Sequence, residues 1–141
     1  MQKDTIKVLL IENDNKYAHH IKELLNKTDS TKFEVTHIDR LAKSFPYLAN
    51  ERFNIVILDL SLPDCIGLET FKVIRDTAPL IPIIVLTKKI VHHNENSNYK
   101  NDAQMYLVKA NTDSQSLVSS ILDTIKNFNI YKKLSSHFVA T

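Results

Sequence analysis

A chain of 141 residues, 43% of them hydrophobic, has the size of one ordinary domain and can bury a substantial core. The net charge of +2 gives no reason to expect a nucleic-acid or membrane surface, and the one cysteine excludes an internal disulfide and fits a reducing compartment such as the cytoplasm. The one glycine excludes both the dinucleotide-binding fingerprint and the phosphate-binding P-loop, which need several glycines, and no apolar run approaches the roughly 20 residues that span a bilayer.

Short apolar runs alternate with amphipathic segments in the first half of the chain. Apolar runs of five or six residues are typical of strands buried on both faces, whereas a 3.6-residue period predicts a helix. We therefore expect a strand, a helix, a second strand and a weaker helix, at Ile6–Ile11, Asp14–Lys27, Phe33–Ile38 and Leu41–Asn50. Pro46 lies inside the last pattern, so that helix should begin near Ser44 and hold the proline in its first turn.

The second half repeats the alternation. Strands are expected at Asn54–Leu58, Ile83–Leu86 and Met105–Val108, and a helix should follow Gly67. Residues 88–104 are polar and rich in asparagine, so a helix there should be short or frayed. The clearest amphipathic pattern runs from Leu117 to Phe128, preceded by a Thr112 and Gln115 spacing that suggests a capping box.

Five strand and helix repeats with short connections predict an α/β fold. The expected architecture is a five-stranded parallel sheet with helices on both faces, the doubly wound (βα)5 arrangement, with no internal domain boundary. In such a sheet the carboxyl ends of the strands share one edge, where ligands bind.

Polar residues follow the strands at that edge. The most informative run goes from Ile55 to Gly67, because a buried strand there ends in Asp59 and is followed by Pro63, which cannot continue a ladder. Since glycine occurs once, we expect Gly67 to adopt a backbone conformation that other residues avoid. The edge should gather a set of polar side chains: Glu12, Asn13, Asp59, Ser61, Thr87 and Lys109.

This set has a chemical logic. Clustered carboxylates repel one another unless a cation compensates, and Mg²⁺ prefers carboxylate and carbonyl oxygens. A carboxylate beside Mg²⁺ can attack phosphorus as a nucleophile. A lysine and a threonine hydroxyl could then bind the oxygens of the transferred phosphoryl group.

From about Thr5 to Phe128 the chain resembles the CheY-like receiver domain of two-component response regulators, which has a flavodoxin-like fold. The family's acidic pair falls on Glu12 and Asn13, its phosphoacceptor on Asp59, and its metal-binding backbone carbonyl on Ser61. Its loop proline and glycine fall on Pro63 and Gly67, its switch residues on Thr87 and Tyr106, and its lysine on Lys109. Each motif is weak alone, but their joint order and spacing are specific.

The resemblance implies a cytoplasmic signalling module rather than an enzyme, with the receiver at residues 4–128. Asp59 would accept a phosphoryl group, with Mg²⁺ bound, from a sensor histidine kinase or a histidine phosphotransfer protein. Thr87 would then move toward the phosphoryl oxygens and Tyr106 would turn inward. The surface of the fourth helix, fifth strand and fifth helix would change and select a partner. Nucleic acid and membrane are not expected as partners of this domain.

Three positions depart from the family pattern. Asn13 replaces the second acid, so we expect weaker Mg²⁺ binding than at a site with two acids. Ala110 follows Lys109 where the family usually has proline, often after a cis bond, so this peptide bond is expected to be trans. Lys88 follows Thr87 where a small residue is common, and it could crowd the phosphoryl group or pair with it.

Two alternative functions remain open. A degenerate receiver would use the same fold as an interaction module that needs no phosphorylation. A phosphatase of the haloacid dehalogenase type would need Asp-x-Asp, and Ser61 stands where its second aspartate would be. The helical pattern continues through residues 129–141, which suggests an extension or linker to an output domain, such as a diguanylate cyclase or sensory module, or a homodimer contact.

Overall fold

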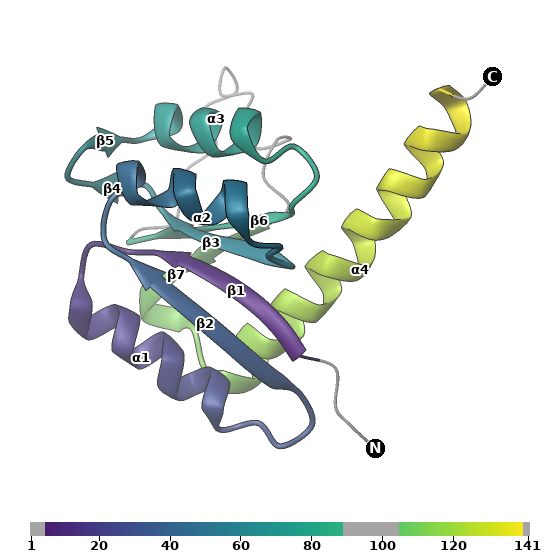
Figure 1. Cartoon of the computed structure of the whole chain (residues 1–141). Helices are drawn as coiled ribbons and strands as arrows, with labels where there is room; N and C mark the ends of the chain where they lie inside the picture. Colours follow the sequence, from purple (N-terminus) through teal and green to yellow (C-terminus); the bar gives the residue numbers. More distant parts are fainter. Residues whose placement is uncertain (1–4, 89–104, 140–141) are drawn as a thin grey trace.

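Strands and helices alternate along the chain in the computed structural model, which describes residues 5–88 and 105–139 (Figure 1). The first half contains β1 (Thr5–Ile11), α1 (Asn15–Asn26), β2 (Lys32–Ile38), the 3₁₀ turn η1 (Leu41–Lys43), α2 (Ser44–Asn50) and β3 (Ile55–Asp59). The second half contains β4 (Ser61–Leu62), β5 (Cys65–Ile66), α3 (Leu68–Thr77), β6 (Ile83–Thr87), β7 (Met105–Val108), the 3₁₀ turn η3 (Lys109–Asn111) and α4 (Ser114–Val139). The helix considered within residues 88–104 falls mostly outside the described residues.

The five main strands form one parallel sheet in the order β2-β1-β3-β6-β7. The register brings their carboxyl ends level, since Ile11 lies opposite both Ile38 and Leu58, and Asp59 lies opposite Leu86. The predicted α/β fold with a five-stranded parallel sheet is confirmed. Because every strand runs the same way, the residues that follow them meet at one edge.

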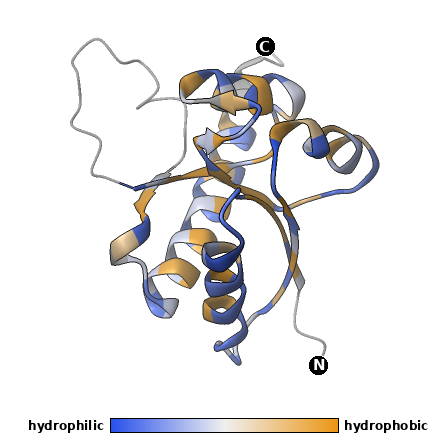
Figure 2. Ribbon diagram, turned by 90° about the vertical axis from the view of Figure 1, so that its left-hand side faces the viewer, coloured by the Kyte–Doolittle hydropathy of each residue, from blue (hydrophilic) through white to orange (hydrophobic). Residues whose placement is uncertain are grey.

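The helices cover both faces of the sheet, as expected for a doubly wound fold (Figure 1). Alternate residues of each buried strand point to opposite faces, so Val8 and Leu10 pack with one pair of helices, and Leu9 and Ile11 with the other. One core cluster contains buried residues from both α1 and α4: Ala18, Ile21, Leu24, Leu25, Leu117 and Ile121. The other contains Phe71 and Ile74 of α3 together with Leu41 beside α2. Figure 2 shows the hydrophobic strands lying between these layers.

Two aspartates cap the helices that cover the first face. Asp14 accepts hydrogen bonds from the backbone N–H groups of Lys16 and Tyr17, which fixes the start of α1. At the start of α4, Asp113 accepts from the N–H of Ser116, while the hydroxyl of Ser116 accepts from the N–H of Asp113. The predicted capping pair of Thr112 and Gln115 was therefore one residue out of place. The Thr112 hydroxyl instead donates to the Val108 carbonyl at 2.8 Å.

A small antiparallel hairpin follows β3, and the sequence pattern did not predict it. Residues of β4 and β5 pair across the turn at Pro63 and Asp64, so the chain folds back before α3 begins. The Asp64 carboxylate accepts hydrogen bonds from the N–H groups of Leu41 and Ala42, at 2.8 and 2.9 Å. The hairpin is thereby tied to the start of η1.

Gly67 lies between this hairpin and α3, as the N-cap residue of the helix, with φ of 74° and ψ of −143°. Its N–H donates to the Leu60 carbonyl at 2.7 Å and its carbonyl accepts from the N–H of Thr70 at 3.1 Å. This combination of φ and ψ is nearly confined to glycine. The expectation of a special backbone conformation at Gly67 is confirmed.

Helix α4 continues without interruption from Ser114 to Val139, and its final part projects away from the sheet (Figure 1). Phe128 is buried, whereas Ile130, Tyr131 and Leu134 are exposed. Residues 129–139 thus form a helical extension, while its use as a linker stays a prediction.

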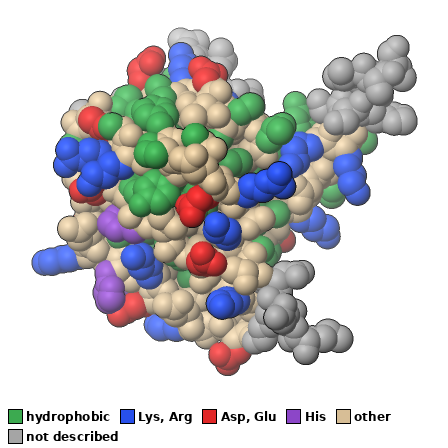
Figure 3. All heavy atoms as spheres, viewed as in Figure 1, with side chains coloured by type: hydrophobic (Ala, Val, Ile, Leu, Met, Phe, Trp, Pro, Cys, Tyr) green, Lys and Arg blue, Asp and Glu red, His purple; other side chains and the backbone are tan. Residues whose placement is uncertain are grey.

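The outer surface is chemically mixed. Figure 3 shows acidic, basic and hydrophobic side chains interspersed over the face seen in Figure 1, in keeping with the small net charge. Within the described ranges, no helix combines the length and apolar character needed to cross a membrane.

Replacing Gly67 with alanine tests the backbone argument. A Cβ built on Gly67 meets no atom within 4 Å, so only the backbone conformation opposes the change. Gly67→Ala should lower the free energy of unfolding by about 1–3 kcal/mol in urea denaturation. Asp76→Ala on the exposed side of α3 should change it by less than about 0.5 kcal/mol. Equal effects of the two substitutions would contradict the argument.

Candidate functional site

Three charged side chains from distant parts of the chain meet at the carboxyl edge of the sheet. Glu12 directly follows β1, Asp59 ends β3, and Lys109 follows β7. The Lys109 ammonium lies 2.9 Å from Oε1 and 2.8 Å from Oε2 of Glu12, and 3.6 Å from Oδ2 of Asp59. One cation therefore lies between two carboxylates, at the sheet edge where we expected these three residues to gather.

Glu12 is completely buried, and hydrogen bonds hold both its backbone and its side chain. Its Oε1 also accepts a hydrogen bond from the N–H of Asp14 at 3.0 Å, while its own backbone N–H donates to Ile38 at 3.0 Å. His37 Nε2 lies 2.7 Å from the Glu12 carbonyl oxygen. Because a carbonyl can only accept, Nε2 must carry the hydrogen of this bond. The backbone and the side chain of Glu12 are thus both fixed.

Asp59 lies deeper than the sequence alone suggests. Only 3% of its surface is exposed, and its Oδ1 accepts a hydrogen bond from the N–H of Ser61 at 3.1 Å. Its Oδ2 is the oxygen closer to Lys109, whose own side chain is 10% exposed. The carboxylate is therefore nearly covered by the surrounding protein.

Burial dominates the acid–base behaviour of Glu12. It raises the pKa of Glu12 to about 7, from 4.5. Hydrogen bonds from Lys109 and from the N–H of Asp14 lower this pKa, and the neighbouring Asp59 carboxylate raises it again. One lysine does not fully offset two buried carboxylates, so the site favours additional positive charge.

The donor atoms suit a hard divalent cation. Oε2 of Glu12 is buried and accepts no well-directed hydrogen bond, although Nζ of Lys109 is close to it. Carboxylate oxygens of Glu12 and Asp59 lie on either side of Lys109, and Mg²⁺ commonly binds through one or two carboxylates while keeping several waters. Among the described residues, no group of three or more acidic, histidine or cysteine side chains is arranged for a metal. The residues present fit Mg²⁺, with less negative charge than a site with three acids.

The remaining candidate residues lie at the same edge or just behind it. Asn13 and Ser61 are exposed, and Thr87 is half-buried at the end of β6 opposite Val108. Tyr106 is half-buried and packs against the core cluster that contains Phe71 and Ile74. The Lys109–Ala110 peptide bond is trans, since the described residues contain no cis bond.

Two residues of the site were missed by sequence reasoning. His37 lies in the predicted strand Phe33–Ile38 and Tyr17 in the predicted helix Asp14–Lys27, and neither was assigned to the site. Their contacts with Glu12 and Lys109 depend on how the elements pack, at separations of 25 and 92 residues along the chain. The one signal in the sequence that could have indicated a role for His37 is its polar ring at the end of a predicted strand.

The raised pKa of Glu12 predicts a specific dependence of stability on pH. Between about 4.5 and about 7 the folded state binds more protons than the unfolded state at this group, so the free energy of unfolding should fall as the pH rises. Glu12→Gln should remove this contribution, which is at most about 3 kcal/mol. Urea denaturation at several pH values across this range measures the contribution of Glu12. Glu34→Gln, which changes an exposed side chain on β2, is the control. An identical pH dependence in wild type and Glu12→Gln would contradict the assignment.

Comparison with characterised sequences supports the receiver-domain family that the sequence motifs resemble. The chain is 26% identical over 104 residues to the probable transcriptional regulatory protein SilR of Salmonella typhimurium, covering 74% of this chain and 44% of that protein. It is 27% identical over 100 residues to the response regulator receiver protein CpdR of Brucella abortus, covering 70% of this chain and 81% of that one. The chain therefore spans less than half of SilR but most of CpdR.

Solved structures share the fold. A CheY-like response regulator receiver domain from Methanospirillum hungatei superposes with a TM-score of 0.72 at 20% identity, covering 91% of this chain and 99% of that one. The receiver domain of a sensor histidine kinase from Pseudomonas aeruginosa, described with a magnesium ion in its active-site cleft, gives 0.73 at 19% identity, covering 87% and 99%.

The family model of the response regulator receiver domain matches residues 8–122, which is most of the chain and includes every residue of the candidate site. With the strand order and the site geometry described above, this match establishes the family. The chain belongs to the response regulator receiver domains, the signalling modules of two-component systems.

Proposed function

We propose that this receiver accepts a phosphoryl group on Asp59. The observation that carries the proposal is the position of the Lys109 ammonium, 3.6 Å from Asp59 and bonded to the buried Glu12. A carboxylate nucleophile needs a nearby cation to offset the charge of an incoming phosphoryl group. In the transfer, an oxygen of Asp59 forms a bond to phosphorus while the bond from phosphorus to the donor nitrogen breaks, and its electron pair leaves with the donor imidazole.

The other residues at this edge of the sheet would each have a separate role in the reaction or in the response to it. Lys109 would pair with a phosphoryl oxygen, and the Thr87 hydroxyl would donate to another after phosphorylation. Tyr106 would then change its packing against the neighbouring core, which links the site to the outer surface. In energetic terms, the phosphoryl group would shift a pre-existing equilibrium between two arrangements.

Mg²⁺ is the cofactor that this site would use. Carboxylate oxygens of Glu12 and Asp59, the amide oxygen of Asn13 and the backbone carbonyl of Ser61 would hold it. When bound, Mg²⁺ supplies positive charge that offsets the carboxylates and the phosphoryl oxygens. The magnesium described in the cleft of the Pseudomonas receiver supports this assignment.

The donor of the phosphoryl group would be a sensor histidine kinase or a histidine phosphotransfer protein. Receivers occur within longer proteins, as the partial coverage of SilR illustrates. Helix α4 would connect this receiver to an output or sensory module, or pair with a second copy. We place this activity in the cytoplasm, where such donors act.

Asp59 is the first position to test. Incubated with Mg²⁺ and acetyl phosphate, the wild type should gain the mass of one phosphoryl group, and Asp59→Asn should gain none because its amide is not a nucleophile. Asp76→Asn, an exposed change on α3, should be labelled like the wild type. Because Asp59 is nearly covered, labelling should be slow with this small donor.

Unlabelled wild type, with no response to beryllofluoride in the presence of Mg²⁺, would contradict the proposal. That outcome would favour the degenerate receiver, in which the fold acts as an interaction module without phosphorylation. Asn13, an amide where a second acid is usual, is the feature that favours this second candidate.

Asn13 also provides a test of metal binding. Asn13→Asp adds a negative charge at the exposed rim of the site, so Mg²⁺ should bind more tightly, by about tenfold or less. Titration of Mg²⁺ followed by the amide NMR signals of residues beside Asp59 measures the dissociation constant. Asn15→Asp, two residues further on and also exposed, is the matched control. Equal or weaker Mg²⁺ binding by Asn13→Asp would refute the assignment of Asn13 to the metal site.

A further inference from the structure

Lys109 is held by α1 as well as by the acidic residues. The Tyr17 hydroxyl donates a hydrogen bond to the Lys109 backbone carbonyl at 3.3 Å. The Lys109 ammonium lies 4.7 Å from the centre of the Tyr17 ring. One side chain on α1 thus contacts both the backbone and the charged end of the lysine.

These contacts close a loop through the site. Oε1 of Glu12 accepts from the N–H of Asp14, and Oδ1 of Asp14 accepts from the N–H of Tyr17 at 3.3 Å. The Tyr17 ring contacts the Lys109 ammonium, and this ammonium in turn donates a hydrogen bond to Glu12. The backbone of Tyr17 is therefore fixed by the cap of α1, which is itself bonded to an acid of the site.

A lysine needs such support at this position. Its side chain has four rotatable bonds and its ammonium can satisfy its charge in several directions, so an unsupported Lys109 would adopt several conformations. An aromatic face within about 6 Å attracts the ammonium and limits these choices. The hydrogen bond from the Tyr17 hydroxyl holds the backbone of Lys109 at the start of the turn η3. It therefore fixes the point from which the Lys109 side chain extends.

We propose that Tyr17 is a positioning residue, which holds the Lys109 ammonium between Glu12 and Asp59 for the reaction at Asp59. The role of Lys109 in that reaction rests on the proposed function, whereas the positioning of Lys109 does not. A purely structural reading is that Tyr17 only fills space, because it also packs against the core cluster of α1 and α4. The two readings differ in what happens to Lys109 when the ring is removed.

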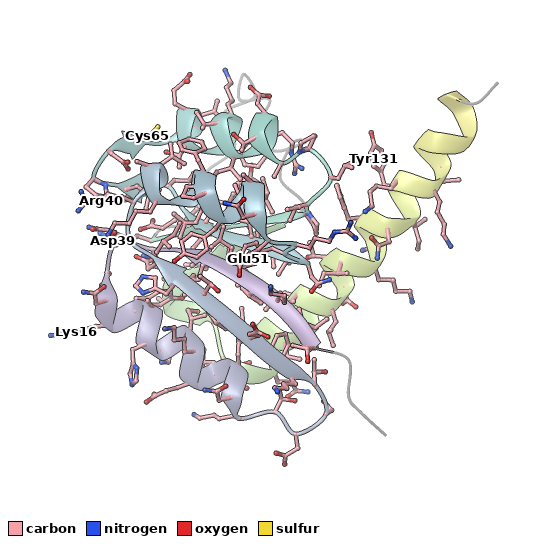
Figure 4. The ribbon with its side chains drawn as sticks, viewed as in Figure 1. Lys16, Asp39, Arg40, Glu51, Cys65 and Tyr131 are labelled. Carbon is pink, nitrogen blue, oxygen red and sulfur yellow. The ribbon has the colours of Figure 1, made fainter. Side chains whose placement is uncertain are left out.

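The first measurement observes Lys109 directly. Protons near an aromatic face are shifted upfield in NMR spectra, so the ε-CH₂ protons of Lys109 should be shifted upfield in the wild type. Tyr17→Phe should keep this shift and Tyr17→Leu should abolish it. Tyr131→Leu, which removes a tyrosine that is 65% exposed on the projecting part of α4, should leave it unchanged (Figure 4).

The second measurement follows the reaction site. Beryllofluoride with Mg²⁺ mimics the phosphoryl group that Lys109 would bind. Its affinity should fall about tenfold in Tyr17→Leu and less than about threefold in Tyr17→Phe, which keeps the ring. Tyr131→Leu should bind like the wild type. A separate urea denaturation of each variant shows whether that variant is folded.

The outcomes separate this inference from the proposed function. An ε-CH₂ shift that is absent in the wild type, or kept in Tyr17→Leu, overturns the positioning role whatever beryllofluoride does. The expected shifts, with a wild type that neither binds beryllofluoride nor is labelled by acetyl phosphate, support the positioning of Lys109 and overturn the phosphoacceptor function. Expected shifts with equal beryllofluoride affinity in wild type and Tyr17→Leu overturn the contribution of Tyr17 to the reaction.

Discussion

The burial of Glu12 at the end of the sheet is the constraint on which the site depends. A fully buried carboxylate is unfavourable unless positive charge and hydrogen bonds compensate for the lost water. Lys109 and the N–H of Asp14 supply part of that compensation. The rest of the edge is arranged around this pair, since Asp59 shares the same ammonium. The negative charge that Lys109 leaves uncompensated is the feature on which the proposed Mg²⁺ binding rests.

The parallel sheet makes this arrangement possible. Residues that are 97 positions apart come within hydrogen-bonding distance because their strands end level. Apolar residues alternate between two core clusters, so the strands hold the edge rigidly while the loops beyond them carry the polar groups. Gly67 and the hairpin before it add a second fixed point, because they bring the chain back from Asp59 toward α3. A binding site at such an edge combines precise placement with access from one side.

Helices around the sheet connect the edge to the rest of the molecule. Helix α1 reaches the site through Tyr17, while Tyr106 of β7 packs on the opposite side of the sheet from α1. Helix α4 starts beside α1, where the Ser114 hydroxyl donates to the Leu24 carbonyl, and ends far beyond the sheet (Figure 1). A change at the edge therefore has contacts through which it can reach both layers of helices. Packed contacts of this kind are one means by which the proposed phosphorylation of Asp59 would be coupled to the outer surface.

Periodicity and composition were sufficient to predict the five strands of the main sheet, their parallel arrangement and the residues at its edge. Strand ends are local features, because a buried apolar run must stop where polar residues begin, and the parallel alternation then requires these ends to meet. The depth of Asp59 and the contacts of His37 and Tyr17 were not predictable in the same way. They depend on distances between elements that no local pattern encodes. The short hairpin at β4 and β5 and the capping by Asp113 were also missed, since turn geometry decides them.

The sequence by itself therefore determined which groups gather at the edge, because side-chain periodicity selects the fold. Only the tertiary structure decided how they share charge, because burial and ångström-scale separation set the strength of each interaction. Lys109 illustrates the difference: its place at a strand end follows from the pattern, whereas its closer approach to Glu12 than to Asp59 follows from packing.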